Sequence, residues 1–155
     1  MPCLRALKIR FYAYNPVAGG LLTNRYSTPS KVPVSGRFGT SSKKGQMYRD
    51  RYWTAAHFEA LSIIRHACDE CHISVQTAAH RWLAHHSKLR WGQNDAVIVG
   101  CSSIAMLREN VRDLREGGPL PVLVLVAMEE AWQRCKDICP IYYRAYSTLS
   151  HAKVN

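Results

Sequence analysis

The alternation of apolar and polar residues changes character along the chain and predicts two short strands among several helices. Residues 8–14 alternate and are rich in aromatic residues, which is typical of a strand. Residues 96–100 form a continuous apolar run of the kind that buried strands of parallel sheets carry. Apolar residues recur at helical spacing over 53–67 and 75–86, where Ala78, Ala79, Trp82 and Leu83 form the predicted packing stripe.

Serines mark where two of the helices are expected to begin. Ser74 precedes the helix predicted over 75–86, and Ser103 precedes the helix predicted over 104–115. A serine hydroxyl at such a position accepts a hydrogen bond from an unpaired amide of the first helical turn. The run 122–135 begins with the strand-like Val-Leu-Val-Leu-Val and continues into strongly helical residues, and we assign it to a helix.

A long segment, residues 15–50, separates the first strand from the first helix and is rich in Gly, Ser, Pro, Thr and Lys. We interpret it as a loop, and loops of this length in compact proteins are usually functional or disordered. Strands separated by helices indicate parallel pairing. Since two parallel strands cannot form an independent sheet with both faces covered, the pattern indicates a piece of a larger α/β fold.

Composition narrows the class of partner. The chain has 155 residues, 47% of them apolar, and its 21 Lys and Arg against 11 Asp and Glu give a net charge of +10. This surplus favours an anionic partner. The basic residues are scattered, which argues against nucleic acid, and the longest apolar run is about half of the ~20 residues that a membrane span needs. Without a recognisable secretory signal, the six cysteines are expected to be reduced in a cytoplasmic protein.

The first strand runs into a loop suited to a phosphate. Asn15-Pro16 ends the strand, Ala18-Gly19-Gly20 lacks bulky side chains, and Arg25 supplies a cation. Backbone amides in such a loop can approach a ligand closely.

The sequence supports a metal site less well than a phosphate site. His66, Cys68, Cys71 and His72 place four soft ligands in seven residues, but no second pair stands at zinc-finger spacing. We therefore predict no metal site. The chain also lacks a Walker motif and a GxGxxG fingerprint.

Six segments, in order, carry a likeness to a known family: FYAYNPVAGGLLTNRY, GRF, MYRDRYW, HRWLAHHS, DAVIVGCSS with REN, and CPIYYR. They resemble the C-terminal part of aldo-keto reductases, in particular the aflatoxin B1 aldehyde reductase subfamily. The resemblance implies an incomplete (β/α)8 TIM barrel containing strands 7 and 8 and the helices that follow. Residues 1–144 are then the C-terminal part of an NADP-dependent oxidoreductase domain, and residues 145–155 a frayed tail.

The resemblance also implies an NADPH site. Its cofactor-binding positions are Asn15, Pro16, Val17, Ala18, Gly19, Gly20, Leu21, Leu22, Thr23, Arg25, Ser102, Ser103, Met106, Glu109 and Asn110. Met106 departs from the polar or cationic residue of related enzymes. The implied substrate-binding residues are Arg37, Tyr48, Arg51 and Arg144. Three guanidinium groups near one tyrosine suit an aldehyde that bears a carboxylate.

The likeness also predicts what the chain lacks. A complete barrel takes about 250 residues, and the first six strands would carry the catalytic Asp, Tyr, Lys and His. We expect a cofactor-binding half without independent activity. The alternative is a non-catalytic interaction fragment that pairs with a full-length reductase, as a homo- or heterodimer, or with a complementary barrel fragment.

Overall fold

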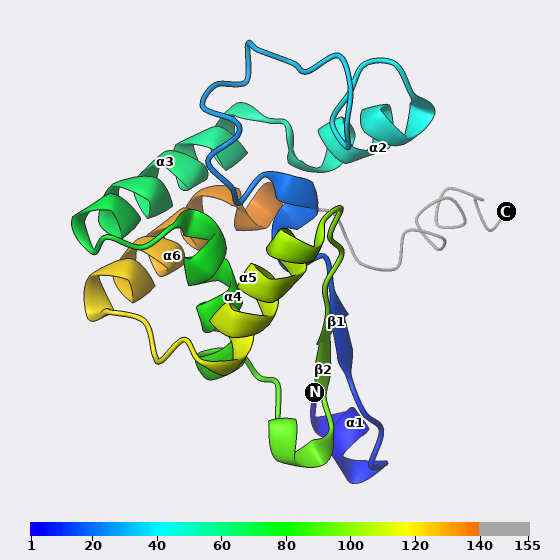
Figure 1. The fold of residues 1–155 in the computed structure, drawn as a ribbon, viewed down its shortest axis with the longest axis vertical. Helices are drawn as coiled ribbons and strands as arrows, with labels where there is room; N and C mark the ends of the chain where they lie inside the picture. The colour runs from blue at the N-terminus through cyan, green and yellow to red at the C-terminus, as the bar shows by residue number, and fades with distance from the viewer. Residues whose placement is uncertain (140–155) are drawn as a thin grey trace, which may run out of the picture.

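A computed structural model describes residues 1–139 of the chain (Figure 1). It combines a cluster of helices with one small sheet. In chain order the elements are α1 (Pro2–Ala6), β1 (Tyr12–Tyr14), η1 (Ala18–Gly20), α2 (Lys43–Tyr52), α3 (Ala55–Glu70), α4 (Val75–His85), η2 (Trp91–Gln93), β2 (Ala96–Ile98), α5 (Ile104–Arg115), α6 (Val122–Cys135) and η3 (Lys136–Ile138). The described part is thus mostly helical, with a two-stranded sheet that is consistent with part of a (β/α)8 barrel.

The two strands pair in parallel, as predicted from their separation by helices. Tyr12 lies opposite Ala96, and Tyr14 lies opposite Ile98. Directly opposed residues share a face of a sheet. On this face Tyr12 is 52% exposed and Ile98 55% exposed. The expectation that residues 96–100 form a buried strand is therefore wrong, because no described element covers this face.

The first strand is shorter than the predicted 8–14. Lys8 adopts φ 53°, and the amide of Ile9 donates to the carbonyl of Leu4 at 2.8 Å, so the chain here curls back onto α1. This local turn directs residues 8 and 9 away from β2. Strand pairing therefore begins only after Phe11, whose carbonyl accepts a hydrogen bond from the amide of Ala96 at 3.0 Å.

Asp95 joins the start of both strands. Its carboxylate accepts hydrogen bonds from the amides of Phe11 and Arg90, both at 2.8 Å, and its side chain is fully buried. The Arg5 guanidinium also donates to this carboxylate, at 2.9 Å through Nη1. The hydrogen bonds from Arg5 hold the pKa of Asp95 well below its usual range. The N-terminal helix is thereby tied to the sheet.

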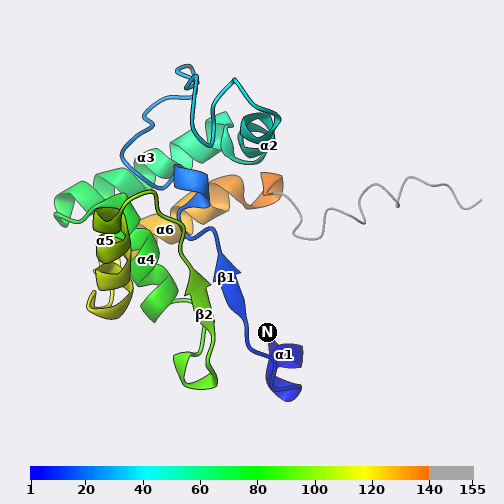
Figure 2. The same ribbon diagram turned by 45° about the vertical axis from the view of Figure 1, so that its right-hand side comes forward.

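The main hydrophobic core lies where α3 and α6 pack against each other, running in opposite directions (Figures 1 and 2). Leu61 is 2% exposed on α3, and Val124 is fully buried on α6. These helices confirm the helical spacing predicted for 53–67 and the choice of helix for 122–135. The helices predicted after Ser74 and Ser103 are also confirmed, and each serine hydroxyl caps its helix as expected.

The packing stripe predicted on α4 is wrong at Trp82. Ala78 and Ala79 are buried, but Trp82 is 39% exposed. The reason is that α5 packs on another side of α4. On that side Gln76 donates to Asn110 at 3.0 Å, and His80, which is 1% exposed, lies 3.4 Å from Asp113.

The segment predicted as a loop over 15–50 contains a helix at its end. Helix α2 begins after Ser42, whose hydroxyl accepts from the amide of Gly45 at 3.0 Å. The earlier part of the segment is held by Phe38, which is fully buried. The Phe38 ring centroid lies 5.3 Å from that of Tyr26 and 4.9 Å from that of Trp53. This aromatic cluster anchors the segment to the start of α3.

Candidate functional site

The glycine loop stands at the carboxyl end of β1. Asn15 adopts φ 61°, and its side-chain oxygen accepts from the amide of Gly19 at 2.7 Å. Its side-chain nitrogen donates to the hydroxyl of Tyr52 at 3.1 Å. Gly19 adopts φ 73°, a conformation that favours glycine. The asparagine therefore fixes a tight turn that directs the chain from the strand into η1.

Gly19 also allows close contact with an aromatic ring. A Cβ atom on Gly19 would lie 2.7 Å from two ring carbons of Tyr48. Gly20, at φ 104°, has open space where its Cβ would stand. One glycine is thus required by packing inside the protein, whereas the next faces space that a ligand can use.

The remaining loop positions divide into anchors and exposed groups. Leu21 is 3% exposed and belongs to the hydrophobic core, against which Leu22 packs. The hydroxyl of Thr23 donates to the carbonyl of Gly20 at 2.7 Å. Pro16, Val17 and Ala18 are half-buried, and Arg25 is exposed. Arg25 is therefore available to an anion at the surface.

Arg37 connects this loop to the end of β2. Its guanidinium carbon lies 5.7 Å from the centroid of the Tyr48 ring. Its Nη2 atom lies 3.7 Å from the position that a Cβ on Gly100 would take. Two of the predicted substrate-binding residues, Arg37 and Tyr48, thus lie together beside the glycine loop.

Of the other two predicted substrate-binding residues, the structure describes Arg51 but not Arg144. Arg51 is half-buried on α2, its Nη2 lies 3.9 Å from the sulfur of Met47, and its Nε has no hydrogen-bond partner among residues 1–139. Arg144 lies outside the described residues. The Arg51 side chain thus lies beside Met47, and its Nε–H remains available to donate a hydrogen bond.

The second predicted cofactor-binding segment is the start of α5. Ser102 and Ser103 are exposed, and the hydroxyl of Ser103 accepts from the amide of Met106 at 3.2 Å. Met106 is half-buried and Glu109 is exposed. Asn110 is 5% exposed and accepts its hydrogen bond from Gln76 on α4. In this conformation Asn110 contacts the neighbouring helix, and its predicted contact with adenine stays a prediction.

The two predicted cofactor-binding segments lie at the same end of the sheet. Because β1 and β2 are parallel, the glycine loop and the chain leading into α5 leave the sheet at the same end (Figure 2). A pocket of about 270 Å³ runs along β1, lined by residues 11–15 and Tyr52. Tyr52 was missed in the sequence, although the MYRDRYW segment places it one helical turn after Tyr48.

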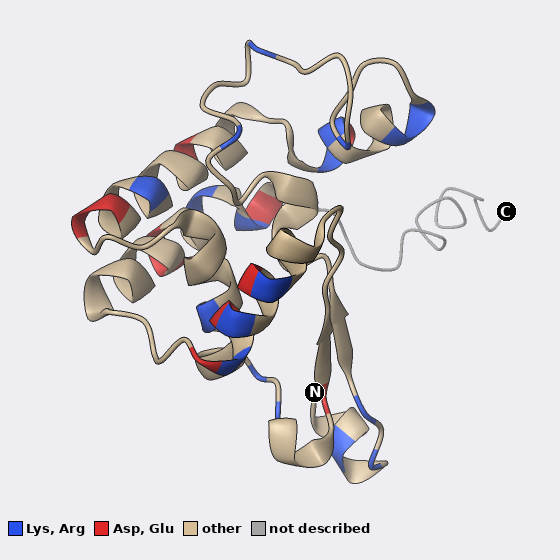
Figure 3. Cartoon of the chain, in the orientation of Figure 1, with Lys and Arg blue, Asp and Glu red and all other residues tan. Residues whose placement is uncertain are grey.

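The positive charge of the chain is consistent with an anionic ligand. Lys and Arg positions are spread over helices and loops along the chain (Figure 3). The exposed Arg25 and Arg37 both belong to the segment that leaves β1. The favourable local feature is thus the Arg37 guanidinium, which lies beside Tyr48 near the glycine turn, and the exposed Arg25 of the same segment adds a second cation.

Comparison with known proteins identifies the family. The sequence model of the Aldo/keto reductase family matches residues 1–121. The chain belongs to this family. Aflatoxin B1 aldehyde reductase member 2 of Homo sapiens is 43% identical over 150 residues, covering 92% of this chain and 41% of the relative. Aldo-keto reductase family 7 member A3 of Homo sapiens is 41% identical over 150 residues, covering 92% of this chain and 44% of the relative.

The similarity extends to fungal members of this aldo-keto reductase family. Aldo-keto reductase pigE of Monascus ruber is 35% identical over 146 residues, covering 92% of this chain and 42% of the relative. The chain therefore spans less than half the length of these curated relatives. Members of the family typically use NAD(P)H. Within residues 1–139, no helix has the length and apolar character needed to cross a membrane.

Proposed function

We propose that this chain forms the NADPH phosphate-binding region of an aldehyde-reducing aldo-keto reductase. The observation that carries the proposal is the turn at Asn15 and Gly19, placed at the carboxyl end of a parallel strand. In (β/α)8 enzymes the ligand lies at this end of the strands, frequently with a phosphate between the last two βα loops. Reduction of an aldehyde is the activity named for one of this chain's relatives, aflatoxin B1 aldehyde reductase member 2 of Homo sapiens.

Different residues are proposed to bind the two phosphate groups of NADPH and the aldehyde substrate. The amides around Gly20 and the guanidinium of Arg25 hold the pyrophosphate, while Ser102 and Ser103 at the start of α5 face the adenosine 2′-phosphate, since a helix N-terminus favours anions. Bound NADPH supplies the hydride. Arg37, Tyr48 and Arg51 orient a carboxylate-bearing aldehyde, with Arg144 as a fourth contributor.

We further propose that residues 1–155 alone do not reduce aldehydes. The resemblance assigns the family's catalytic Asp, Tyr, Lys and His to strands that no segment of this sequence matches. General acid–base assistance typically contributes 10²–10⁴-fold to a rate. The aldehyde's carbonyl oxygen would have no positioned proton donor from that set.

A titration of the chain with NADPH, followed by cofactor fluorescence, tests the binding proposal. Arg25→Met is expected to weaken binding by about 10- to 150-fold, since a hydrogen bond to a charged group contributes about 1.5–3 kcal/mol. Arg10→Met is the matched control, because Arg10 is also exposed but lies before β1. Equal affinities of the two variants would contradict the assignment of the phosphate site.

A turnover assay tests the second part of the proposal. Purified chain, NADPH and an aldehyde that bears a carboxylate are expected to show no cofactor oxidation above background. Sustained oxidation that depends on the aldehyde would show that this chain carries its own catalytic groups. NADPH binding can survive either outcome, so the two parts of the proposal are tested separately.

A second candidate function is pairing with a longer reductase chain. The exposed Tyr12 and Ile98 favour it, because an isolated two-stranded sheet is marginal and an open strand edge can accept another strand. Co-expression with a full-length aflatoxin B1 aldehyde reductase, followed by affinity capture, tests this function. Capture that Tyr12→Glu abolishes, and that Glu59→Gln on α3 leaves intact, is expected. A chain that remains monomeric beside the full-length protein argues against pairing.

A further inference from the structure

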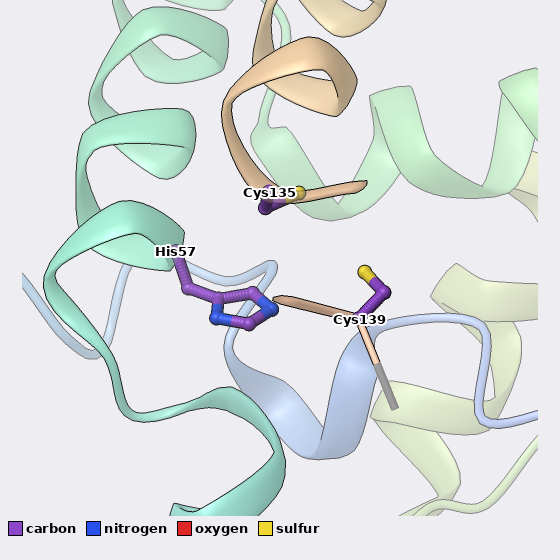
Figure 4. Close-up of side chains that lie close together, drawn as sticks. All are labelled: His57, Cys135 and Cys139. Carbon is purple, nitrogen blue, oxygen red and sulfur yellow. The ribbon is translucent and has the colours of Figure 1, made fainter. Parts of the chain in front are cut away.

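We propose that His57, Cys135 and Cys139 form a zinc-binding site at the junction of α3 and α6, apart from the glycine loop. One ligand atom from each residue lies within 4.8 Å of the other two (Figure 4). The sequence alone predicts no metal site, so this proposal rests on the structure. Among the described residues, the metal-ligating side chains that converge are these three and not the His66–His72 segment.

The fold brings the three residues together across a long separation in sequence. His57 lies in the first turn of α3, and Cys135 is the last residue of α6. The two helices run in opposite directions, so the start of one lies beside the end of the other (Figure 1). Cys139 follows a single turn of 3₁₀-helix, η3, which returns the chain toward Cys135.

The histidine is oriented as a metal ligand needs to be. Its Nδ1 atom lies 2.8 Å from the hydroxyl of Thr54, which also accepts from the backbone amide of His57 at 3.4 Å. With Nδ1–H donated to Thr54, the lone pair of Nε2 is free for the metal. Figure 4 shows the imidazole pointing from α3 toward Cys139. Ligating histidines are usually fixed by such a hydrogen bond from their second nitrogen.

The chemistry of the three ligands suits zinc. All three ligands are soft or borderline donors, which favour Zn²⁺ over Mg²⁺ or Ca²⁺. Zinc takes thiolates at about 2.3 Å and imidazole at about 2.0–2.1 Å, which places tetrahedral ligand atoms about 3.5–4 Å apart. Closing the present arrangement therefore requires a shift of about 1 Å, within reach of side-chain rotation. Cys135, whose thiol now donates to the carbonyl of Ala131 at 3.3 Å, and Cys139 are partly accessible, so the metal has a route to the site.

Charge balance follows from the protonation state of the thiols. Zn²⁺ replaces the proton of each thiol, so two protons leave to solvent and two thiolates neutralise the ion. Three protein ligands leave the fourth tetrahedral position to water. The bound metal would fasten the end of α6 to the beginning of α3.

Cobalt titration of the full chain tests the site. Protein freed of metal by a chelator and kept reduced is titrated with Co²⁺, whose thiolate charge-transfer and tetrahedral d–d absorption report the ligands. We expect one Co²⁺ per chain, displaced by Zn²⁺ because zinc binds such sites more tightly. Absence of thiolate–cobalt absorption in the reduced protein would overturn the proposal.

Variants identify the ligands. Cys135→Ser and Cys139→Ser are each expected to weaken Co²⁺ binding by more than about 100-fold. Substitution of a residue that only hydrogen-bonds to a metal ligand already lowers metal affinity by about 10–100-fold, and loss of the ligand itself should cost more. Cys71→Ser is the matched control, because Cys71 is also partly buried but belongs to the segment between His66 and His72. Loss of the cobalt spectrum in Cys71→Ser, with the spectrum retained in Cys135→Ser, would assign the metal to that other segment.

The positioning role of Thr54 has its own test. Thr54→Val is expected to weaken Co²⁺ binding by about 10-fold, whereas Thr54→Ser, which keeps the hydroxyl, restores it. Circular dichroism of each metal-free variant shows whether its helices are intact, so that a loss of folding is not counted as a loss of ligands. Equal affinities for Thr54→Val and Thr54→Ser would remove Thr54 from the site.

Discussion

Replacement of Gly19 by alanine probes whether the glycine loop packs as the structure has it. Gly19 adopts φ 73°, and a Cβ there would lie 2.7 Å from two carbons of the Tyr48 ring. The left-handed backbone alone costs an L-residue about 1–2 kcal/mol. Displacing the ring adds about 1–3 kcal/mol, the usual cost of overpacking. We therefore expect Gly19→Ala to lower the free energy of unfolding by about 2–5 kcal/mol.

A control and a double variant separate the two contributions. Gly36 adopts φ 85° with open space around its Cβ position, so Gly36→Ala is expected to cost only the backbone contribution. In a Tyr48→Ala background the ring is gone, and Gly19→Ala should also cost about 1–2 kcal/mol. Urea unfolding of the four proteins in this cycle, and of Gly36→Ala, measures the differences. If Gly19→Ala costs no more than Gly36→Ala, or if its cost is unchanged without Tyr48, the contact that we describe is absent.

Three further predictions concern stability. Burial lowers the pKa of His80 in the folded protein, so the neutral imidazole contributes its full stability at a pH above the pKa of histidine in the unfolded chain, and this contribution is lost as the pH falls. The free energy of unfolding, measured with urea between about pH 7.5 and 5.5, should therefore decline less in His80→Gln than in His66→Gln. Ser103→Ala should cost about 1 kcal/mol through loss of the helix cap, with little change in Ser102→Ala. Leu61→Ala, in the core between α3 and α6, should cost about 2–5 kcal/mol in the same assay.

The helices were predictable because their signals are local. Ser74 and Ser103 each stand immediately before an apolar repeat, and both caps are confirmed. Helix α2 was missed because its sequence, KKGQMYRDRY, is polar and carries no continuous apolar stripe. Its stability comes from the Ser42 cap and from Tyr48, whose ring centroid lies 5.9 Å from that of Phe38. Contacts of that kind depend on the tertiary structure and leave little trace in local periodicity.

The candidate site was predictable to the extent that its geometry is encoded in short segments. The small residues at Gly19 and Gly20 indicated a tight loop, and the structure shows positive φ at both. The role of Tyr52 was not apparent, because its hydrogen bond to Asn15 requires α2 to fold back beside β1. The convergence of His57 with two cysteines was even less accessible, since only the antiparallel packing of α3 and α6 brings them together.

The loop and the sheet depend on different parts of the protein. The glycine loop is held by Leu21 in the core, by the contact of Gly19 with Tyr48 and by the hydrogen bond between Asn15 and Tyr52. None of these contacts involves the exposed face of the sheet that carries Tyr12. A partner that added strands at the edges of the sheet would therefore leave these loop contacts in place. For this reason phosphate binding and partner binding are separable properties of the chain, and loss of one leaves the other open to measurement.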